Sequence, residues 1–201
     1  MKKFLIGFLV LILALAAISF ALPGSYEVQR SIVIAADAQR IQAPLSDLTT
    51  WPEWSAWSRE RDASAEWSFS GDVGEGQEWK WEGEELGKGR LRLTKVIPGE
   101  GILYQIAFID PDMQGTGHIS IETSGESCTV TWTSRGELGR NPLNRLFGVF
   151  LDGILGPDLE TGLAGIKRVA EAGPQGIGAV EAGESTGEDS PPEDSGADTD
   201  Q

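Results

Sequence analysis

Trp51-Pro52-Glu53-Trp54-Ser55-Ala56-Trp57 is the stretch around which the rest of the chain is organised. It holds three of the seven tryptophans and stands between a short helical pattern, residues 37–50, and a long series of alternating runs. A large aromatic side chain buries about 150–250 Å², so we expect these rings to close one end of a hydrophobic core. Two interpretations stay open: the rings pack against one another, or some of them line a cavity that accepts an apolar guest.

The composition is that of one globular domain with appendages, and its charge balance is strongly acidic. Hydrophobic residues make up 40% of the 201 residues and charged residues 23%, which is ordinary for a folded protein. The formal net charge of −15 argues against nucleic-acid binding, because that function needs lysine and arginine to neutralise phosphates. It also argues against docking on anionic lipid by charge attraction. Cys128 is the only cysteine, which excludes an internal disulfide and a cysteine-based metal cluster.

An uncharged apolar run from Phe4 to Leu22 follows Lys2 and Lys3. Its 19 residues are enough for a helix that crosses a hydrocarbon core of about 30 Å, and the apolar part of a secretory signal is usually shorter. We expect residues 1–24 to be an uncleaved membrane anchor; the alternative is a signal peptide cleaved after Ala21. The positive-inside rule keeps the two lysines in the cytoplasm. Both alternatives place the following domain outside the cytoplasmic membrane, on the periplasmic or extracellular side, either tethered or secreted.

The residues before the tryptophan stretch predict one strand and then short helices. Apolar residues alternate with polar ones from Tyr26 to Ile34, the period of a strand. Apolar residues then recur at helical spacing after Asp37, which suits a helix N-cap. Pro44 interrupts this helical pattern, so we expect two short helices that meet at an angle.

Residues 65–138 alternate between apolar and polar side chains and predict an antiparallel meander with one apolar face. Turn-forming residues separate the runs at Gly71-Asp72, Gly83 to Gly87, Pro98-Gly99, Asp110-Pro111 and Ser124-Gly125. An open sheet with so many large residues on one face must be covered by another layer.

The covering element follows the meander directly. Asn141 suits an N-cap and Pro142 the first position of a helix. An apolar stripe with spacings of three and four then continues to about Ala172, and Gly156-Pro157 must kink or restart the helix. We therefore expect an α+β helix-grip fold in residues 25–172, with a curved antiparallel sheet wrapped around a long C-terminal helix.

Residues 173–201 consist largely of Gly, Pro, Ser, Glu and Asp, and neither Lys nor Arg occurs after Arg168. Such a segment cannot bury enough apolar area to offset the entropy lost on ordering. We expect a disordered acidic tail that serves as a solvated spacer; the alternative is a docking site for a basic partner.

Few residues suit catalysis, and we expect no cofactor, no metal and no catalytic residue. His118 is the only histidine, and alternation points it away from the apolar face. Tyr104 is the one polar-tipped side chain on that face, and its hydroxyl needs a backbone carbonyl or a ligand oxygen as partner. Asp110-Pro111-Asp112 has the pattern of a turn rather than of a paired carboxylate site.

Several short motifs occur in a characteristic order between Tyr26 and Val169. They are Tyr26-Glu27-Val28-Gln29-Arg30-Ser31-Ile32-Val33-Ile34, Asp47-Leu48, the tryptophan stretch, Gly74-Glu75-Gly76, Gly87-Lys88-Gly89, Thr129-Val130-Thr131-Trp132 and Asp158-Leu159-Glu160-Thr161-Gly162-Leu163. In this order the chain resembles the SRPBCC superfamily of START-like and birch-pollen-allergen-like domains. It is most similar to the polyketide cyclase/dehydrase-type group, some of whose members carry an N-terminal membrane segment.

The resemblance implies a deep apolar cavity between the sheet and the long helix, which would hold a lipid-like, polyketide-like or other hydrophobic small molecule. The side chains expected to line it are Trp54, Trp57, Trp67, Trp79, Trp81, Tyr104, Phe108, Trp132, Phe147 and Leu151. Fold alone does not choose a function. A membrane-tethered, non-catalytic binder or carrier is favoured, because the apolar face offers no acid or base. The alternatives are a cyclase- or dehydratase-type enzyme and a non-catalytic envelope interaction module.

Overall fold

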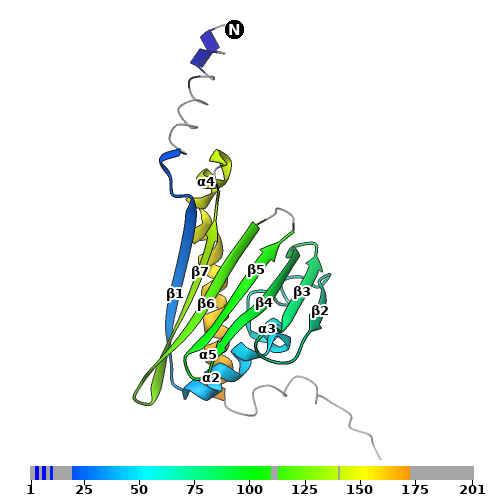
Figure 1. The fold of residues 1–201 in the computed structure, drawn as a ribbon, viewed down its shortest axis with the longest axis vertical. Helices are drawn as coiled ribbons and strands as arrows, with labels where there is room; N and C mark the ends of the chain where they lie inside the picture. Colours follow the sequence, from blue (N-terminus) through cyan, green and yellow to red (C-terminus); the bar gives the residue numbers. More distant parts are fainter. Residues whose placement is uncertain are drawn as a thin grey trace, which may run out of the picture.

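The computed structural model describes residues 3–4, 6–7, 10, 20–109, 113–139 and 141–172. Within them, a seven-stranded antiparallel sheet curves around a long C-terminal helix, which confirms the predicted fold class (Figure 1). The strand order is β1-β7-β6-β5-β4-β3-β2, so β2 to β7 form a meander and β1 pairs with the last strand. The strands are β1 (Ser25–Ile34), β2 (Glu66–Ser70), β3 (Glu78–Gly83), β4 (Gly87–Ile97), β5 (Gly101–Phe108), β6 (Met113–Ser124) and β7 (Ser127–Glu137).

Short helices follow β1 and longer helical structure follows β7. Between β1 and β2 lie α2 (Ala38–Ser46), the 3-10 helix η1 (Leu48–Thr50) and α3 (Trp51–Trp54). After β7 come α4 (Pro142–Gly148) and α5 (Leu151–Ala172). α5 packs against β1 and β7 and contacts α2 and α3, so the tryptophan stretch is held between the sheet and α5.

The period-two pattern of the sequence accounts for the sheet. Trp79 of β3 pairs with Leu91 of β4, Leu91 pairs with Ile106 of β5, and all three side chains are buried on the face toward α5. The predicted breaks at Gly71-Asp72, Gly83 to Gly87, Pro98-Gly99 and Ser124-Gly125 all separate strands of the sheet. In two of these breaks the chain turns at Gly99 and Gly125. Their φ angles are 77° and 64°, a region of backbone conformation that glycine adopts more easily than other residues.

The helical pattern breaks as predicted, but at Asp47 rather than at Pro44. α2 continues through Pro44 and ends at Ser46, and Asp47 then adopts an extended conformation with φ −119° and ψ 102°. The Asp47 carboxylate accepts a hydrogen bond from the backbone N–H of Thr49 at 3.0 Å and so caps η1. The helix therefore ends where a side chain can start the next helical turn, and not at the proline itself.

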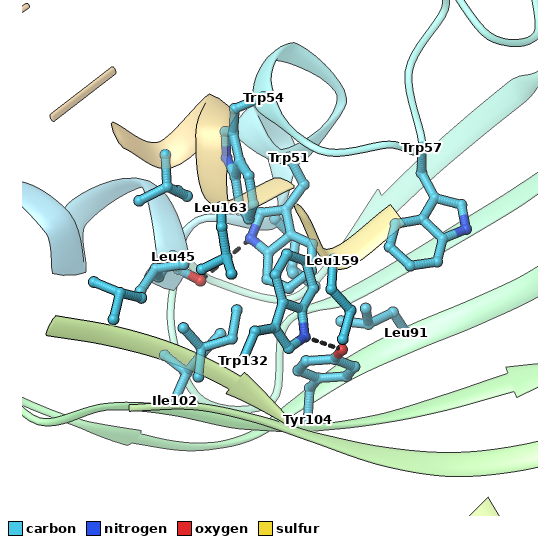
Figure 2. Packing of buried hydrophobic residues seen from close by; sticks show 14 of the residues in the cluster. Leu45, Trp51, Trp54, Trp57, Leu91, Ile102, Tyr104, Trp132, Leu159 and Leu163 are labelled. Atoms are coloured by element: carbon cyan, nitrogen blue, oxygen red, sulfur yellow. Dashed lines mark hydrogen bonds between the residues drawn. The ribbon is translucent and has the colours of Figure 1, made fainter. Parts of the chain in front are cut away.

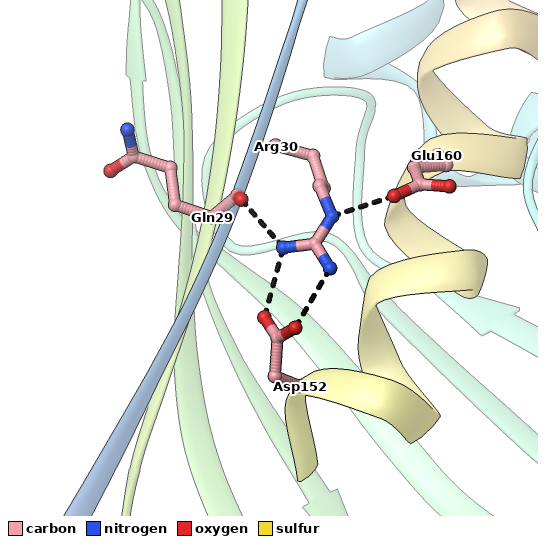
Figure 3. Close-up of polar contacts among 4 residues, drawn as sticks. All are labelled: Gln29, Arg30, Asp152 and Glu160. Atoms are coloured by element: carbon pink, nitrogen blue, oxygen red, sulfur yellow. Dashed lines mark hydrogen bonds and ion pairs between the residues drawn. The ribbon is translucent and has the colours of Figure 1, made fainter.

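The predicted interruption at Gly156-Pro157 was wrong in position. α5 is one helix through Pro157, and the chain leaves the α-helical pattern at Val149 and Phe150 instead. Arg30 on β1 holds α5 on both sides of the proline (Figure 3). Its guanidinium donates to both carboxylate oxygens of Asp152 at 2.9 and 3.1 Å and to Glu160 at 2.7 Å. These bonds raise the pKa of Arg30 above its ordinary value and tie both turns of α5 to β1.

The described parts of the predicted anchor are helical at residues 3–4, 6–7, 10 and 20–21, and the apolar side chains of Phe4, Ile6, Val10 and Phe20 are exposed. None of the helices in the described part of the chain has the length and apolarity needed to cross a membrane. The rest of the apolar run, the turn at Asp110-Pro111-Asp112 and the tail at 173–201 lie outside the described residues.

Candidate functional site

The centre of the interior is a cluster of aromatic rings around Trp51 (Figure 2). The centroid of its ring lies 4.8 Å from that of Trp54, 5.6 Å from Tyr104, 5.8 Å from Trp132 and 6.5 Å from Trp79. Three of these contacts are edge-to-face, an arrangement that aromatic quadrupoles favour. Trp51 is fully buried and joins the short helices to the sheet.

Local hydrogen bonds fix the two tryptophans of α3. The indole N–H of Trp51 donates to the carbonyl oxygen of Leu45 at 3.3 Å, and that of Trp54 donates to the hydroxyl of Thr50 at 3.4 Å. Pro52 stands in the first turn of α3, where its missing N–H costs nothing. Both rings are thereby directed from one short helix toward the sheet.

The sheet contributes a second fixed pair, Trp132 of β7 and Tyr104 of β5. The indole N–H of Trp132 donates to the Tyr104 hydroxyl oxygen at 2.8 Å (Figure 2). Burial raises the pKa of Tyr104 above its ordinary value, so the hydroxyl stays protonated at neutral pH. The partner that the sequence required for this hydroxyl is therefore another side chain of the core.

α5 comes close to these rings because two of its residues have no side chain. A Cβ atom at Gly162 would collide with the ring of Trp132, and one at Gly165 would collide with the backbone carbonyl of Trp54. The helix thus lies in contact with both the sheet and α3 at this level. Side chains fill the centre of the space between the sheet and α5. Any guest must displace some of these side chains or bind beside them.

A second aromatic group lies toward the β2 edge of the sheet. Trp79 stacks with Trp67 at 5.0 Å and with Phe69 at 6.0 Å, and its ring lies 5.2 Å from that of Trp81. The guanidinium of Arg59 lies 5.9 Å from the centroid of Trp67. The indole N–H groups of Trp67 and Trp79 are buried and have no hydrogen-bond partner among the described residues. Most buried donors in folded proteins are paired, so these two mark a place where an acceptor is missing.

Eight of the ten residues predicted to line a cavity belong to this interior cluster. Trp54, Trp57, Trp79, Trp81, Tyr104 and Trp132 are buried in it, Trp67 and Phe108 are partly buried against it, and Leu151 is buried outside it. Phe147 lies apart from this interior, on α4, and its side chain is 45% exposed. Trp51, the ring at the centre of the cluster, was absent from the predicted set although it belongs to the tryptophan stretch.

The exposure of Phe147 has a local cause. The predicted stripe assumes helical spacing from Pro142 onward, but the chain tightens between α4 and α5. Val149 N–H donates to Leu146 O at 3.3 Å and Phe150 N–H donates to Phe147 O at 2.9 Å, which are three-residue steps. The tighter turn separates the apolar face of α4 from that of α5, so the two faces point in different directions.

The hollows shown by the structure lie at the margins of the core. One of about 820 Å³ is on the outer face of the sheet, rimmed by Arg90, Arg92 and Arg135. A smaller cleft of about 240 Å³ lies between the start of β1 and the junction of α4 with α5, where Val28 and Leu151 line it. This small cleft reaches side chains of the interior, and so does a third hollow, of about 750 Å³, which Trp67, Trp81 and Phe108 line.

Asp62 is a titratable group whose partners belong to the fold. The carboxylate of Asp62 accepts hydrogen bonds from the backbone N–H groups of Leu86 at 2.9 Å and Glu85 at 2.8 Å, and from Ser64. These bonds lower the pKa of Asp62 to about 2. His118 is half-buried on the opposite face of β6 from the core. Within the residues that the structure describes, no group of His, Cys, Asp and Glu could hold a metal ion.

The sequence of residues 25–171 matches the family described as polyketide cyclase/dehydrase and lipid transport. The chain belongs to this family. The match covers the folded domain from β1 to the end of α5 and confirms the SRPBCC resemblance seen in the sequence motifs. Comparison with curated proteins gives no match.

Solved structures with the same fold include a truncated norcoclaurine synthase from Thalictrum flavum, with a TM-score of 0.54 and 16% identity over 72% of this chain and 92% of that one. The di-domain ARO/CYC StfQ of the steffimycin biosynthetic pathway has a TM-score of 0.57 and 16% identity, over 74% of this chain and 52% of that one. A protein of unknown function from Staphylococcus aureus has a TM-score of 0.57 and 10% identity, over 74% of this chain and 94% of that one. At these identities the similarity shows the fold alone.

Proposed function

We propose that the domain binds a hydrophobic small molecule, lipid-like or polyketide-like, that carries a hydrogen-bond acceptor, and that it holds this acceptor against the indole N–H of Trp79. The observation that carries the proposal is that this N–H is buried without a partner in a side chain that is 0% exposed. Leaving a buried donor unpaired costs about 1–3 kcal/mol, and a carbonyl, ether or hydroxyl oxygen of a guest would recover it. The description of the family, which includes lipid transport, supports a guest of this class.

A guest would reach Trp79 from the free edge of the sheet. Trp79 and Trp67 lie next to the free edge of the sheet, where β2 has only five residues and most of its side chains are exposed. A short edge strand bordered on one side by solvent opens more easily than a central strand. The guest would therefore lie between β2, β3 and the loop that carries Trp57, beside the filled centre.

Binding is favoured over catalysis by the state of the ionisable groups near the core. Asp62 is ionised and its oxygens are occupied by backbone N–H groups, which leaves it unsuited to proton transfer at neutral pH. Tyr104 is held protonated by burial and accepts a hydrogen bond from Trp132. A cyclase or dehydratase needs a group whose pKa lies near the working pH, and neither residue offers one.

We further propose that residues 1–24 tether the domain to the membrane, outside the cytoplasm. The length and apolarity of the run from Phe4 to Leu22 support this, as do the helical conformation and exposed side chains of its described residues. The full chain should stay with membranes after a carbonate wash. A soluble mature protein that begins near Leu22 would show instead that the run is a cleaved signal.

The binding proposal is tested with two guests of equal length, a long-chain methyl ketone and the corresponding hydrocarbon, each displacing an environment-sensitive dye from the full chain. The protein should prefer the ketone, and Trp79→Phe should weaken ketone binding by about 2- to 12-fold, the equivalent of one hydrogen bond of about 0.5–1.5 kcal/mol. Binding of the hydrocarbon should change little. Trp132→Phe is the matched control, because its N–H is already paired with Tyr104.

Two results would overturn this assignment. If the natural chain binds neither the dye nor any lipid that native mass spectrometry detects, the domain is not a carrier. If Trp79→Phe and Trp132→Phe affect the ketone and the hydrocarbon equally, the unpaired N–H does not recognise the guest.

A further inference from the structure

Five large apolar side chains are exposed together on α4, the α4–α5 junction and the first turn of α5. They are Leu143 at 72%, Phe147 at 45%, Val149 at 60%, Phe150 at 65% and Ile154 at 48% exposed, and we call them the α4 patch. Outside the N-terminal run, the other exposed large apolar residues of the described chain occur singly. Single exposed apolar residues are normal, whereas a contiguous group marks a surface that another partner covers.

The orientation of α4 is fixed, so the patch is not the result of a loosely attached helix. Asn141 caps the helix by accepting from the N–H of Leu143 at 3.0 Å. On the inner side, Gly148 lies so close to the buried side chain of Leu138 that a Cβ atom there would collide with it. Because this face of α4 must remain against Leu138, the apolar face must remain outward.

The patch lies where the chain leaves the predicted anchor. Arg145 of α4 donates from Nη1 to the carbonyl oxygens of Phe20 at 3.3 Å and Leu22 at 3.2 Å, and from Nε to that of Gly139 at 3.0 Å. The last residues of the apolar run are thus bound directly to the helix that carries the patch. Figure 1 shows both at the same end of the domain, beyond the start of β1.

Another exposed apolar residue, Ile109, lies where β5 ends. It follows β5, whose last residue Phe108 pairs with Met113 at the start of β6, and β6 in turn pairs Gly115 with Gly136 near the end of β7. Ile109 is 56% exposed. Ile109 therefore adds one apolar side chain at the end of β5 to those exposed on α4.

We propose that the α4 patch is seated in the interface of a lipid bilayer, beside the N-terminal run. This rests on the membrane tether proposed above, which brings the patch to the bilayer surface. A short amphipathic helix binds a bilayer interface through its buried apolar area. The chain is strongly acidic, and Arg145, the cation of α4, is occupied by backbone carbonyls, so apolar contact and not charge attraction holds the patch there.

The test places a fluorescent reporter on the patch of the full chain, reconstituted in phosphatidylcholine vesicles with and without phosphatidylglycerol. Phe150→Cys carries a nitrobenzoxadiazole label, and Val33→Cys at the far end of β1 is the control, an exposed apolar position away from α4. The native Cys128 is buried and is replaced by Ala in both. At position 150 the emission should shift to the blue and be quenched by spin-labelled lipid in both kinds of vesicle. At position 33 it should remain that of water.

The experiment distinguishes a failure of the α4 patch proposal from a failure of the membrane-tether proposal. Water-like emission at position 150 from protein that floats with the vesicles refutes the patch, and so does a blue shift that spin-labelled lipid does not quench, since that means a protein covers it. Protein that does not float refutes the tether. The patch is then tested by adding the same labelled chain to preformed vesicles, where lipid quenching supports it and its absence refutes it.

Discussion

Replacing Tyr104 by Phe should reveal whether the core between the sheet and α5 is free of water and filled by side chains. The substitution keeps the ring and removes the oxygen that accepts the indole N–H of Trp132 at 2.8 Å. Trp132 is 0% exposed, so its N–H would join those of Trp67 and Trp79 as a buried donor without a partner. We expect the free energy of unfolding to fall by about 1–3 kcal/mol, which corresponds to about 2–4 °C in Tm for each kcal/mol in a domain of this size.

A double-mutant cycle isolates this bond. Tyr104→Phe, Trp132→Phe and the double variant are compared by urea unfolding, followed by circular dichroism because tryptophan fluorescence would change with Trp132. The coupling free energy should be about 0.5–1.5 kcal/mol. A neutral or stabilising Tyr104→Phe would refute the reasoning, because it would mean that water or another acceptor reaches the indole and that the centre is hollow.

Tyr104 should also make the stability of the fold depend on pH in the alkaline range. Folding raises the pKa of Tyr104 above its ordinary value near 10, so the stability due to its neutral form is complete below about pH 10 and is lost as the pH rises further. Tyr26, also partly buried with a raised pKa, contributes in the same direction. The Tyr104→Phe variant should therefore lose less stability between neutral pH and about pH 11 than the natural protein; equal losses would assign the effect to other groups.

Five other changes test the interior, the loops and the tail. Phe147→Ala should cost less than about 1 kcal/mol because the ring is 45% exposed, whereas Leu151→Ala, at 2% exposed, should cost about 2–5 kcal/mol in the same urea melts; equal costs would contradict the orientation of α4. Asp62 has a pKa of about 2, so its contribution to stability is present above about pH 4 and is lost as the pH falls toward 2. Asp62→Asn should lower Tm at neutral pH and flatten this acid dependence, and an unchanged acid profile would show that other carboxylates govern it. Arg30→Met should speed hydrogen exchange in the first turns of α5 by removing the bonds to both sides of Pro157, and exchange as slow as in the natural protein would show that packing alone holds the helix. Removing residues 173–201 should leave Tm nearly unchanged; a drop of several degrees would mean that the tail docks on the domain.

The sequence alone determined the order of the elements, because each element leaves a local pattern. Alternation with period two marked the strands between residues 65 and 138, and turn residues marked their ends. Asn141 and Pro142 located the start of α4, as capping chemistry requires. These signals depend on neighbours within a few residues, and together with the motif order they were sufficient to predict the helix-grip fold.

The tertiary structure decided what depends on distant partners. Arg30 binds α5 on both sides of Pro157 through contacts 122 and 130 residues away, which no local pattern around Pro157 reveals. The tightened turn at Val149 directs Phe147 outward and creates the α4 patch, although the sequence continues the apolar stripe. Whether an indole N–H is paired, as in Trp132, or unpaired, as in Trp79, depends on which atoms the folded chain brings within hydrogen-bond distance. Helical and strand periods fix which face a residue occupies, but the pairing of side chains across the core is set by packing between segments far apart in the chain.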